Sequence, residues 1–436
     1  MGGLLGRRVV ELSILGGSMR ILIATAGSRG DVVPYTGLGA QLRQAGHLVS
    51  VATHTRFAAL VEVAGLEFRA LPVDPMAELV SDRGQRLVRA RSAAREVAEL
   101  IRLGRQLMPA LGQGVLSAVR RGCDVLLLSA TLAPLGQVVA EAFGLPSIGV
   151  FLQPMTPTRE FQAPVPITRP LGPWGDYLVG RVTEAVMDQL LYPAVRQLRR
   201  RLGLPALTIA AQRRRAQRRG WPVLHGFSPA VVARPADWRP GMEVCGYWWP
   251  YQDPHWQPPA ELVDFVQAGP PPVFVGFGSR VVPDVERLGA IVGAALRQTG
   301  LRAVVQTGWS GLSIPSDDVF PVDEVPHHWL FPRMAAVVHH YGAGTTAAGL
   351  RAGIPAVPVP AQFDTPFWAA RLTALGVADA PIPLRKLSVG RLAAALKKAI
   401  EEPALRSRAH TLAARLAAED GAAQVLHTLQ RVDTSP

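Results

Sequence analysis

A carboxylate follows a glycine-rich stretch near the beginning of the chain. Residues 27–34 read GSRGDVVP, so Asp31 stands directly before a predicted helix. The loop that precedes it consists of Gly27, Ser28, Arg29 and Gly30. Glycines let a backbone approach a ligand closely, and a carboxylate can take the proton of a hydroxyl group. Asp31 is therefore a candidate for a carboxylate that faces a ligand, although the same residues allow Asp31 only to cap the helix.

A second glycine-rich loop lies in the C-terminal half. Residues 340–346 read HYGAGTT and connect a predicted strand at 335–339 to a predicted helix at 345–352. The first N–H groups of a helix lack intrahelical partners and bind anions such as a diphosphate. The residues predicted at this anion are His340, Gly342, Gly344 and Thr345. We expect Thr345 and Thr346 to cap the helix, and a plain glycine turn with a threonine cap is the alternative.

Histidines occur in adjacent pairs that do not form a metal motif. His327 is followed by His328, and His339 by His340. Adjacent side chains of a strand point to opposite faces, so such a pair cannot ligate one ion from one side. The sequence adds no carboxylate pair or cysteine cluster that would complete a site. We predict no metal and no cofactor.

The chain is strongly basic. It has 46 Lys and Arg against 33 Asp and Glu in 436 residues, a net charge of +13. Arginines concentrate at 83–105 and 199–219 without the interleaved aromatic residues of a nucleic-acid surface, so we expect no nucleic-acid partner. Two interpretations of these arginines stay open: solvated helix faces, or a patch that faces an anionic membrane.

The sequence also bears on the compartment. No run of 18 apolar residues occurs, and residues 1–18 make a poor signal peptide, so we expect them to be a disordered extension. The two cysteines, Cys123 and Cys245, are too far apart in sequence for a redox or zinc motif. We predict a cytoplasmic protein, with a peripheral contact at the inner face of the membrane if the basic patch faces lipid.

Strands and helices alternate twice along the chain. The predicted strands are residues 20–26, 48–53, 125–129 and 147–152, then 273–277, 302–306, 335–339 and 356–360. Short apolar runs separated by helices are typical of parallel sheets with helices on both faces. We therefore predict an α/β protein of two facing, Rossmann-like, doubly wound domains with a cleft between them.

The boundaries follow from composition. The predicted parts are an N-terminal domain at 19–240, a Pro- and Trp-rich linker at 241–272, a C-terminal domain at 273–405 and a final segment at 406–436. Two long amphipathic helices are expected at 389–401 and 404–430, and the last is expected to cross back to the N-terminal domain. The region 151–192 is expected to be rich in loops and to form an apolar lid or groove with residues 71–112.

These motifs resemble a known family. The stretch 325–365, together with GSRGDVVP, the segment 226–238 and PPVFVGFGS at 271–279, resembles the UDP-glycosyltransferase superfamily of inverting GT-B enzymes. Within it the chain looks like the branch that glycosylates sterols, glycolipids and natural products. The resemblance implies that the C-terminal half holds the nucleotide sugar and the N-terminal half the acceptor.

The resemblance also implies roles for further residues. Ser279 would lie near the diphosphate, Val325 would hold the base, and Asp364 would bind sugar hydroxyls, with Thr365 next to it. The family usually has Gln at position 365 and a small residue at position 341, where this chain has Thr365 and Tyr341. A missing Gln allows a deoxyhexose in place of glucose. The resemblance implies that Asp31 is the general base and that the loop at 27–30 faces the acceptor. Some relatives use His at position 31 with an orienting Asp, whereas residues 129–131 here read SAT, which favours a lone Asp.

The predicted function is therefore the transfer of a hexose or deoxyhexose from a UDP- or TDP-sugar to a hydroxyl of an apolar acceptor. The acceptor would be a sterol, a glycolipid, or a polyketide or peptide natural product. An epimerase would need further acid and base groups that the sequence does not offer. A catalytically silent nucleotide-sugar or lipid-binding protein of the same fold is the alternative.

Overall fold

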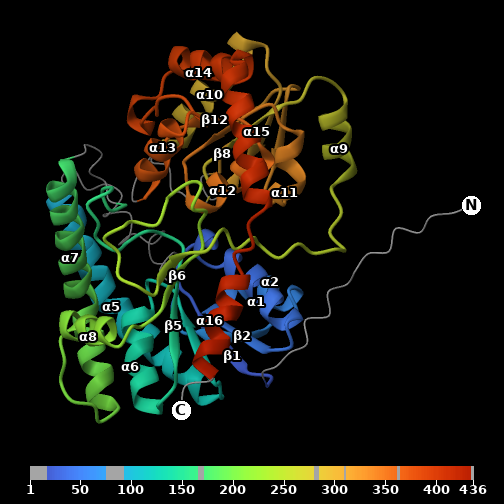
Figure 1. Cartoon of the computed structure of the whole chain (residues 1–436). Coiled ribbons are helices and arrows are strands. Elements are labelled where there is room, and N and C mark those ends of the chain that lie inside the picture. The colour runs from blue at the N-terminus through green and yellow to red at the C-terminus, as the bar shows by residue number, and fades with distance from the viewer. Residues whose placement is uncertain are drawn as a thin grey trace, which may run out of the picture.

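The structure is a computed structural model. It describes residues 17–74, 93–164, 171–278, 284–308, 311–360 and 364–433. Two α/β domains face each other, with the N-terminal domain below the C-terminal domain in Figure 1. Within the described residues, none of the helices is long and apolar enough to cross a membrane.

The N-terminal domain is built on a seven-stranded parallel sheet with the order β3-β2-β1-β4-β5-β6-β7. Its strands are β1 (Arg20–Ala24), β2 (Leu48–His54), β3 (Glu67–Leu71), β4 (Val125–Leu128), β5 (Ser147–Phe151), β6 (Val223–His225) and β7 (Met242–Val244). Its helices are η1 (Arg29–Asp31), α1 (Val33–Gln44), η2 (Thr55–Phe57), α2 (Ala58–Val63), α5 (Ala93–Arg120), α6 (Ala133–Phe143), α7 (Gly172–Arg201) and α8 (Ile209–Arg218). The strand β7 lies within the segment that we expected to be a linker.

The C-terminal domain contains a five-stranded parallel sheet with the order β10-β9-β8-β11-β12. Its strands are β8 (Val273–Gly276), β9 (Ala303–Gln306), β10 (Val319–Val322), β11 (Val337–His339) and β12 (Ala356–Pro358). Its helices are α9 (Ala260–Gln267), α10 (Val285–Thr299), α11 (His327–Leu330), η4 (Phe331–Arg333), α12 (Ala343–Ala352), α13 (Thr365–Ala374), η5 (Leu384–Lys386), α14 (Val389–Glu401) and α15 (Pro403–Ala417). The predicted pair of doubly wound parallel domains is confirmed.

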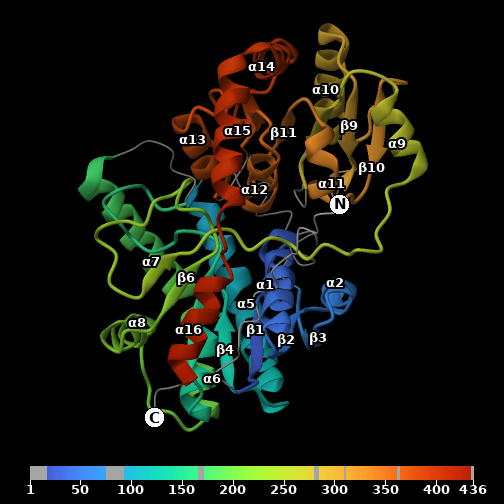
Figure 2. The same ribbon diagram turned by 45° about the vertical axis from the view of Figure 1, so that its right-hand side comes forward.

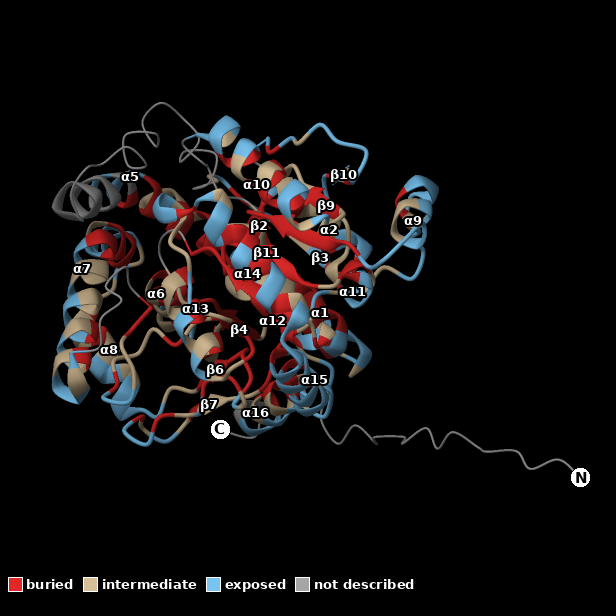
Figure 3. Ribbon diagram, turned by 90° about the horizontal axis from the view of Figure 1, so that it is seen from above, coloured by how far each residue is buried: buried red, intermediate tan, exposed pale blue. Residues whose placement is uncertain are grey.

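The continuous apolar strands are buried on both faces. In β1, Ile21 and Ile23 pack with α1, α2 and the last helix, α16 (Ala423–Asp433), whereas Leu22 and Ala24 pack with α5, α6 and α7. Alternate residues of a strand point to opposite faces, so a run without polar residues requires a helical layer on each side. Seen from above in Figure 3, buried residues run through the centre and exposed residues cover the outer helix faces.

The C-terminal end of the chain departs from the prediction. We expected one helix over 404–430, but α15 ends at Ala417 and α16 begins at Ala423. At the break, a side chain on Gly421 would lie 2.7 Å from the carbonyl oxygen of Tyr247, and Trp248 donates a hydrogen bond to the Gly421 carbonyl. The chain turns at this close approach, so α15 packs on α12 while α16 packs on the N-terminal sheet (Figures 1 and 2).

Two further expectations are wrong in part. Residues 172–201 form one 30-residue helix, α7, where we expected loops. The basic cluster at 199–219 is not simply solvated, because Arg199 is 2% exposed and lies 2.7 Å from Glu141. Arg213 pairs with Glu184 at 3.3 Å, so this cluster joins α6, α7 and α8 through ion pairs. Most of the other cluster lies outside the described residues, and membrane contact stays a prediction.

Candidate active site

A cavity of about 1800 Å³ lies between the two domains, and residues of both domains line it. It is at the carboxyl ends of both sheets, where the strand order reverses: between β1 and β4 in one domain and between β8 and β11 in the other. Loops that leave neighbouring strands in opposite directions open a crevice at such a point, and ligands of open α/β sheets bind there. The loops after β1 and β11, predicted above as functional, therefore face the same cavity.

The loop after β1 forms a tight turn around the Asp31 carboxylate. Its Oδ2 accepts hydrogen bonds of 2.8 Å from both the backbone N–H and the Oγ hydroxyl of Ser28. The helix α1 begins after Val32 and has no side-chain cap, so the interpretation of Asp31 as its cap is wrong. Because Oδ2 is held within the turn, Oδ1 is the oxygen left to meet a substrate.

A glycine is required where this turn begins. Gly27 has φ of +144°, and a Cβ there would lie 2.5 Å from Oδ2 of Asp31. The carboxylate therefore folds back over a position that only glycine can fill. Two residues that the sequence analysis missed hold Gly27 in place: His54 accepts its N–H at 2.9 Å, and Arg56 donates to its carbonyl at 3.0 Å.

His54 acts as a neutral acceptor in this arrangement. Its side chain is 1% exposed, and burial lowers its pKa below the ordinary value. A neutral ring has one nitrogen without a proton, and here Nε2 accepts the N–H of Gly27. The one sequence signal was its place at the carboxyl end of β2, beside β1 in the sheet.

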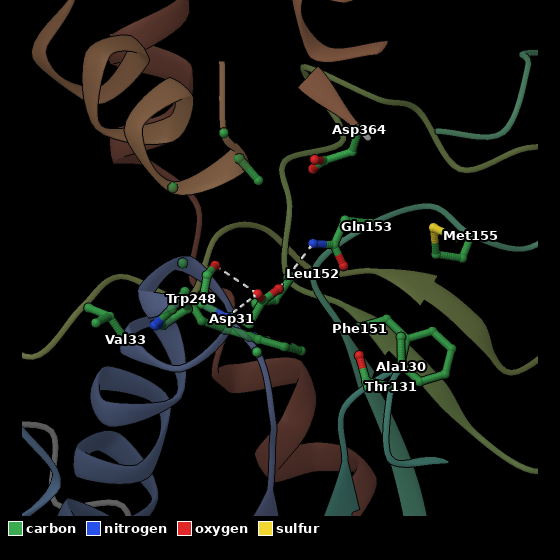
Figure 4. Close-up of a pocket in the computed structure, with 18 of the residues that line it drawn as sticks. Asp31, Val33, Ala130, Thr131, Phe151, Leu152, Gln153, Met155, Trp248 and Asp364 are labelled. Carbon is green, nitrogen blue, oxygen red and sulfur yellow. Dashed lines mark hydrogen bonds between the residues drawn. The ribbon is translucent and has the colours of Figure 1, made fainter. Parts of the chain in front are cut away.

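Gln153 is a further residue that sequence reasoning missed. It follows β5, lines the cavity and donates through Nε2 to Oδ1 of Asp31 at 3.5 Å. Figure 4 shows this contact together with Ala130 and Thr131, which also line the cavity. In the described structure, Asp31 thus receives hydrogen bonds from a hydroxyl, a backbone amide and a side-chain amide.

The loop after β11 presents the N-terminal end of α12 to the cavity. The helix begins at Ala343 with Gly342 as its N-cap and without a side-chain cap, so the expected caps Thr345 and Thr346 are wrong. Gly342 adopts the extended N-cap conformation, and its carbonyl accepts the first helical hydrogen bond, from Thr346. The N–H groups of residues 343–345 come before that bond and have no acceptor within the helix, so they can donate hydrogen bonds to an anion.

The His340 ring lies between two glycines. A Cβ at Gly278 would lie 2.9 Å from Cε1 of His340, and a Cβ at Gly342 would lie 2.7 Å from its Nε2. Either side chain would displace the ring. Gly278, His340, Gly342, Gly344 and Thr345 all line the cavity, so the structure brings these residues together.

Tyr341 adopts a backbone conformation that is unusual for its type. Its φ is +68°, the left-handed region, and it is the one non-glycine residue with positive φ in the described chain. Its ring is fully buried and stacks on His339 with centroids 4.2 Å apart. The resemblance implies a small residue here, and the stacking provides a physical reason for a large one, since the buried ring offsets backbone strain.

The remaining predicted residues are placed differently from one another. Val325 and Asp364 line the cavity, and Asp364 accepts a 3.0 Å hydrogen bond from the Trp368 indole. Thr365 is fully buried in the first turn of α13 and is absent from the cavity lining. Ser279 lies outside the described residues. The structure therefore brings Asp364 to the cavity but not Thr365.

The two domains touch next to the site. The short helix η1, which carries Asp31, packs against α12. Arg29 of η1 also forms a 3.0 Å ion pair with Glu324, the neighbour of Val325. The loop with the candidate base is thus in contact with both segments expected to hold the nucleotide.

Comparisons with known proteins agree with this geometry. Residues 21–162 match the glycosyltransferase family 28 N-terminal domain, and residues 304–432 match the C-terminal domain of erythromycin biosynthesis protein CIII-like proteins. A sterol 3-beta-glucosyltransferase of Arabidopsis thaliana is 35% identical over 93% of this chain and 64% of its own length. The chain thus spans slightly less than two thirds of that relative. The O-mycaminosyltylonolide 6-deoxyallosyltransferase of Streptomyces fradiae is 38% identical over 92% of this chain and 95% of its own length.

Solved structures share the fold. The glycotransferase of kitacinnamycin superposes with a TM-score of 0.70 over 95% of this chain and 99% of that chain, at 18% identity. SsfS6 of Streptomyces sp. SF2575, in complex with thymidine diphosphate, superposes with a TM-score of 0.65 over 95% of this chain and 99% of that chain, at 22% identity. Two facing parallel α/β domains with the site between them define the GT-B class of glycosyltransferases. The chain belongs to the UDP-glycosyltransferase superfamily.

Proposed function

We propose that this protein is an inverting glycosyltransferase with Asp31 as its general base. It would transfer a hexose or deoxyhexose from a UDP- or TDP-sugar to a hydroxyl of an apolar acceptor. One observation carries the proposal: Asp31 and the N-terminal end of α12 belong to different domains and line one cavity. A base and an anion site on facing walls suit a reaction in which the nucleophile attacks opposite to the leaving group.

The proposed step uses groups on both walls. Oδ1 of Asp31 takes the proton of the acceptor hydroxyl while its oxygen attacks the anomeric carbon. The bond from that carbon to the diphosphate breaks, and the electron pair leaves with the nucleoside diphosphate. The N–H groups at the start of α12 and the His340 ring stabilise the charge that develops there. Asp364 would hold sugar hydroxyls, and the backbone near Val325 would hold the base.

The class of acceptor is proposed from the part of the cavity that the N-terminal domain lines. Apolar side chains of α7 line it, among them Leu178, Val182, Met187 and Leu190. Such a surface favours a large apolar molecule that carries a hydroxyl. Sterol and tylonolide transferases among the relatives support this class, as does the thymidine diphosphate bound to SsfS6 for the donor.

The first test replaces Asp31 by Asn, which keeps the size of the side chain and removes the base. Asp31→Asn should lower kcat by about 100-fold or more, because a positioned general base contributes about 10²–10⁴-fold. A UDP or TDP conjugate should still raise its melting temperature as in wild type, with or without EDTA. The matched control is Asp253→Asn, a carboxylate of the same cavity that should tolerate the change.

Other outcomes would overturn parts of the proposal. Turnover of Asp31→Asn close to wild type would remove Asp31 as the base. A product that retains the donor's anomeric configuration would exclude the inverting step. Binding of a nucleotide sugar or a lipid without turnover by the wild type, whatever acceptor is offered, would favour the silent binding protein instead.

A further inference from the structure

The two oxygens of the Asp31 carboxylate are held from different parts of the chain. Oδ2 is bound by Ser28, which lies in the same turn and moves with Asp31. Oδ1 is approached by Nε2 of Gln153, which lies 122 residues further along the chain, after β5. A side chain from a separate element can fix the carboxylate relative to the sheet, whereas Ser28 can only shape its turn.

The elements that carry Asp31 and Gln153 are joined by a buried hydrogen bond. The Tyr35 hydroxyl, in the first turn after Asp31, donates to the Val150 carbonyl at 2.6 Å. Val150 is a fully buried residue of β5, and Tyr35 is 1% exposed. A buried bond without water as a competitor fixes the distance between α1 and β5. The approach of Gln153 to Asp31 is therefore built into the scaffold.

The segment that begins at Gln153 also reaches the donor domain. Met155 donates its N–H to the Gln153 carbonyl at 3.0 Å, which turns the chain across the cavity. Further along, Phe161 packs on Phe367 of α13 with ring centroids 5.6 Å apart. Asp364 is the residue directly before that helix, and Figure 4 shows Gln153 between Asp31 and Asp364 in projection. The segment 153–161 thus contacts both Asp31 and the helix α13, which Asp364 precedes.

We propose that Gln153 is a positioning residue of the transfer reaction: its amide donates to Oδ1 of Asp31 and turns this oxygen toward the acceptor hydroxyl. The inference rests on the assignment of Asp31 as the base under the proposed function. The amide also stabilises the ionised carboxylate, the form that can accept a proton. The 3.5 Å contact is long, and such contacts shorten when substrate closes a site.

The position of the amide makes its effect specific. Before transfer, Oδ1 can accept both the Gln153 N–H and the acceptor hydroxyl, because a carboxylate oxygen has two lone pairs. When the proton arrives at Oδ1, it uses one of these lone pairs, and the hydrogen bond from the Gln153 amide to Oδ1 weakens. Gln153 therefore stabilises the ionised carboxylate of the resting enzyme and orients its Oδ1. It takes no part in making or breaking bonds.

The test compares Gln153→Met, which keeps length without a donor, with Gln153→Glu, which places a second carboxylate beside Asp31. Gln153→Met should lower kcat about tenfold with little change in KM for the donor. The acid limb of log(kcat/KM) against pH should move to higher pH, since the ionised carboxylate loses the hydrogen bond from Nε2 of Gln153. Gln153→Glu should move it further in the same direction, because like charges repel.

The matched control is Gln217→Met, which changes a glutamine on the α8 side of the same cavity and should leave the pH profile unchanged. An unmoved acid limb in both Gln153 variants, while Asp31→Asn remains inactive, would overturn the role of Gln153 alone. Full turnover by Asp31→Asn would instead overturn the proposed base. All variants should keep the donor-induced rise in melting temperature, which shows that the fold and the donor site are intact.

Discussion

At the scale of single residues, the site depends on positions without side chains. Gly27 leaves room for the Asp31 carboxylate, while Gly278 and Gly342 leave room for the His340 ring. These three glycines differ in what they provide. Gly27 and Gly278 also have positive φ, whereas Gly342 has φ of −61°, which any residue adopts. A substitution at Gly342 therefore tests space alone, without backbone strain.

We predict that Gly342→Ala weakens the binding of a nucleoside diphosphate about tenfold. The new Cβ would lie 2.7 Å from Nε2 of His340, so the ring must move away from the anion site. Calorimetric titration with UDP and TDP measures the change. The same substitution in a His340→Ala background should have little further effect, because the two residues act on one contact. Equal losses in both backgrounds would contradict this coupling. Gly390→Ala, with open space around it, is the control for general stability.

At the scale of the element, β6 carries a buried histidine whose burial disfavours protonation. His225 is fully buried, stacks on Trp238 with centroids 4.5 Å apart, and interacts through Nδ1 with the Glu243 carbonyl at 3.0 Å. A carbonyl only accepts, so Nδ1 must carry the proton of the neutral ring. Burial lowers the pKa of His225 from 6.5 to about 4. The strand is thus compatible with the neutral form only.

This burial makes stability depend on pH. Between pH 6.5 and pH 4 the unfolded chain binds a proton at His225 and the folded chain does not, so stability falls as the pH falls. His225→Asn keeps a donor near the Glu243 carbonyl and removes the titrating group. The loss of unfolding free energy between pH 7 and pH 4.5 should be smaller in this variant by about 2 kcal/mol. Urea unfolding at several pH values measures it, and identical slopes for both proteins would contradict the prediction.

At the scale of the whole molecule, the chain crosses between the domains more than once. After the C-terminal domain is complete, residues 418–422 lead back and α16 covers β1 and its neighbours (Figure 2). Near the site, Arg29 and Glu324 form an ion pair between the domains, and their side chains are 41% and 61% exposed. An exposed pair of this kind contributes at most about 1 kcal/mol. The packing of α16 on the N-terminal sheet is therefore a stronger link between the two domains than this ion pair.

We predict that the last helix stabilises the first domain. Val425 and Leu429 of α16 are fully buried against Ile21 and its neighbours. Leu429→Ala should lower the unfolding free energy of the N-terminal domain by about 2–4 kcal/mol, the range for a buried leucine that leaves a cavity. Limited proteolysis should then cut first in the N-terminal domain. Gln430→Ala, at an exposed neighbour, should have no effect, and first cuts in the C-terminal domain would contradict the assignment.

The sequence by itself determined the four adjoining strands β2-β1-β4-β5 of one parallel sheet, the strands β9-β8-β11-β12 of the other, and the two loops that carry Asp31 and His340. Apolar runs, glycine turns and helix periodicity are local features, and the carboxyl ends of parallel strands meet at one edge whatever the rest of the chain does. The predicted strands at 48–53 and 302–306 agree with β2 and β9 within one or two residues. Local patterns suffice wherever the partners of a residue are its neighbours in sequence.

Only the tertiary structure decided which side chains surround those loops. The contacts of Asp31 with Gln153, of Gly27 with His54 and of Gly421 with Tyr247 join residues that are far apart in sequence. The burial of Thr365 and Arg199, both polar, depends on elements packed from elsewhere in the chain. No periodicity encodes such contacts, because they arise from the way layers pack and leave space, which is a property of the folded molecule as a whole.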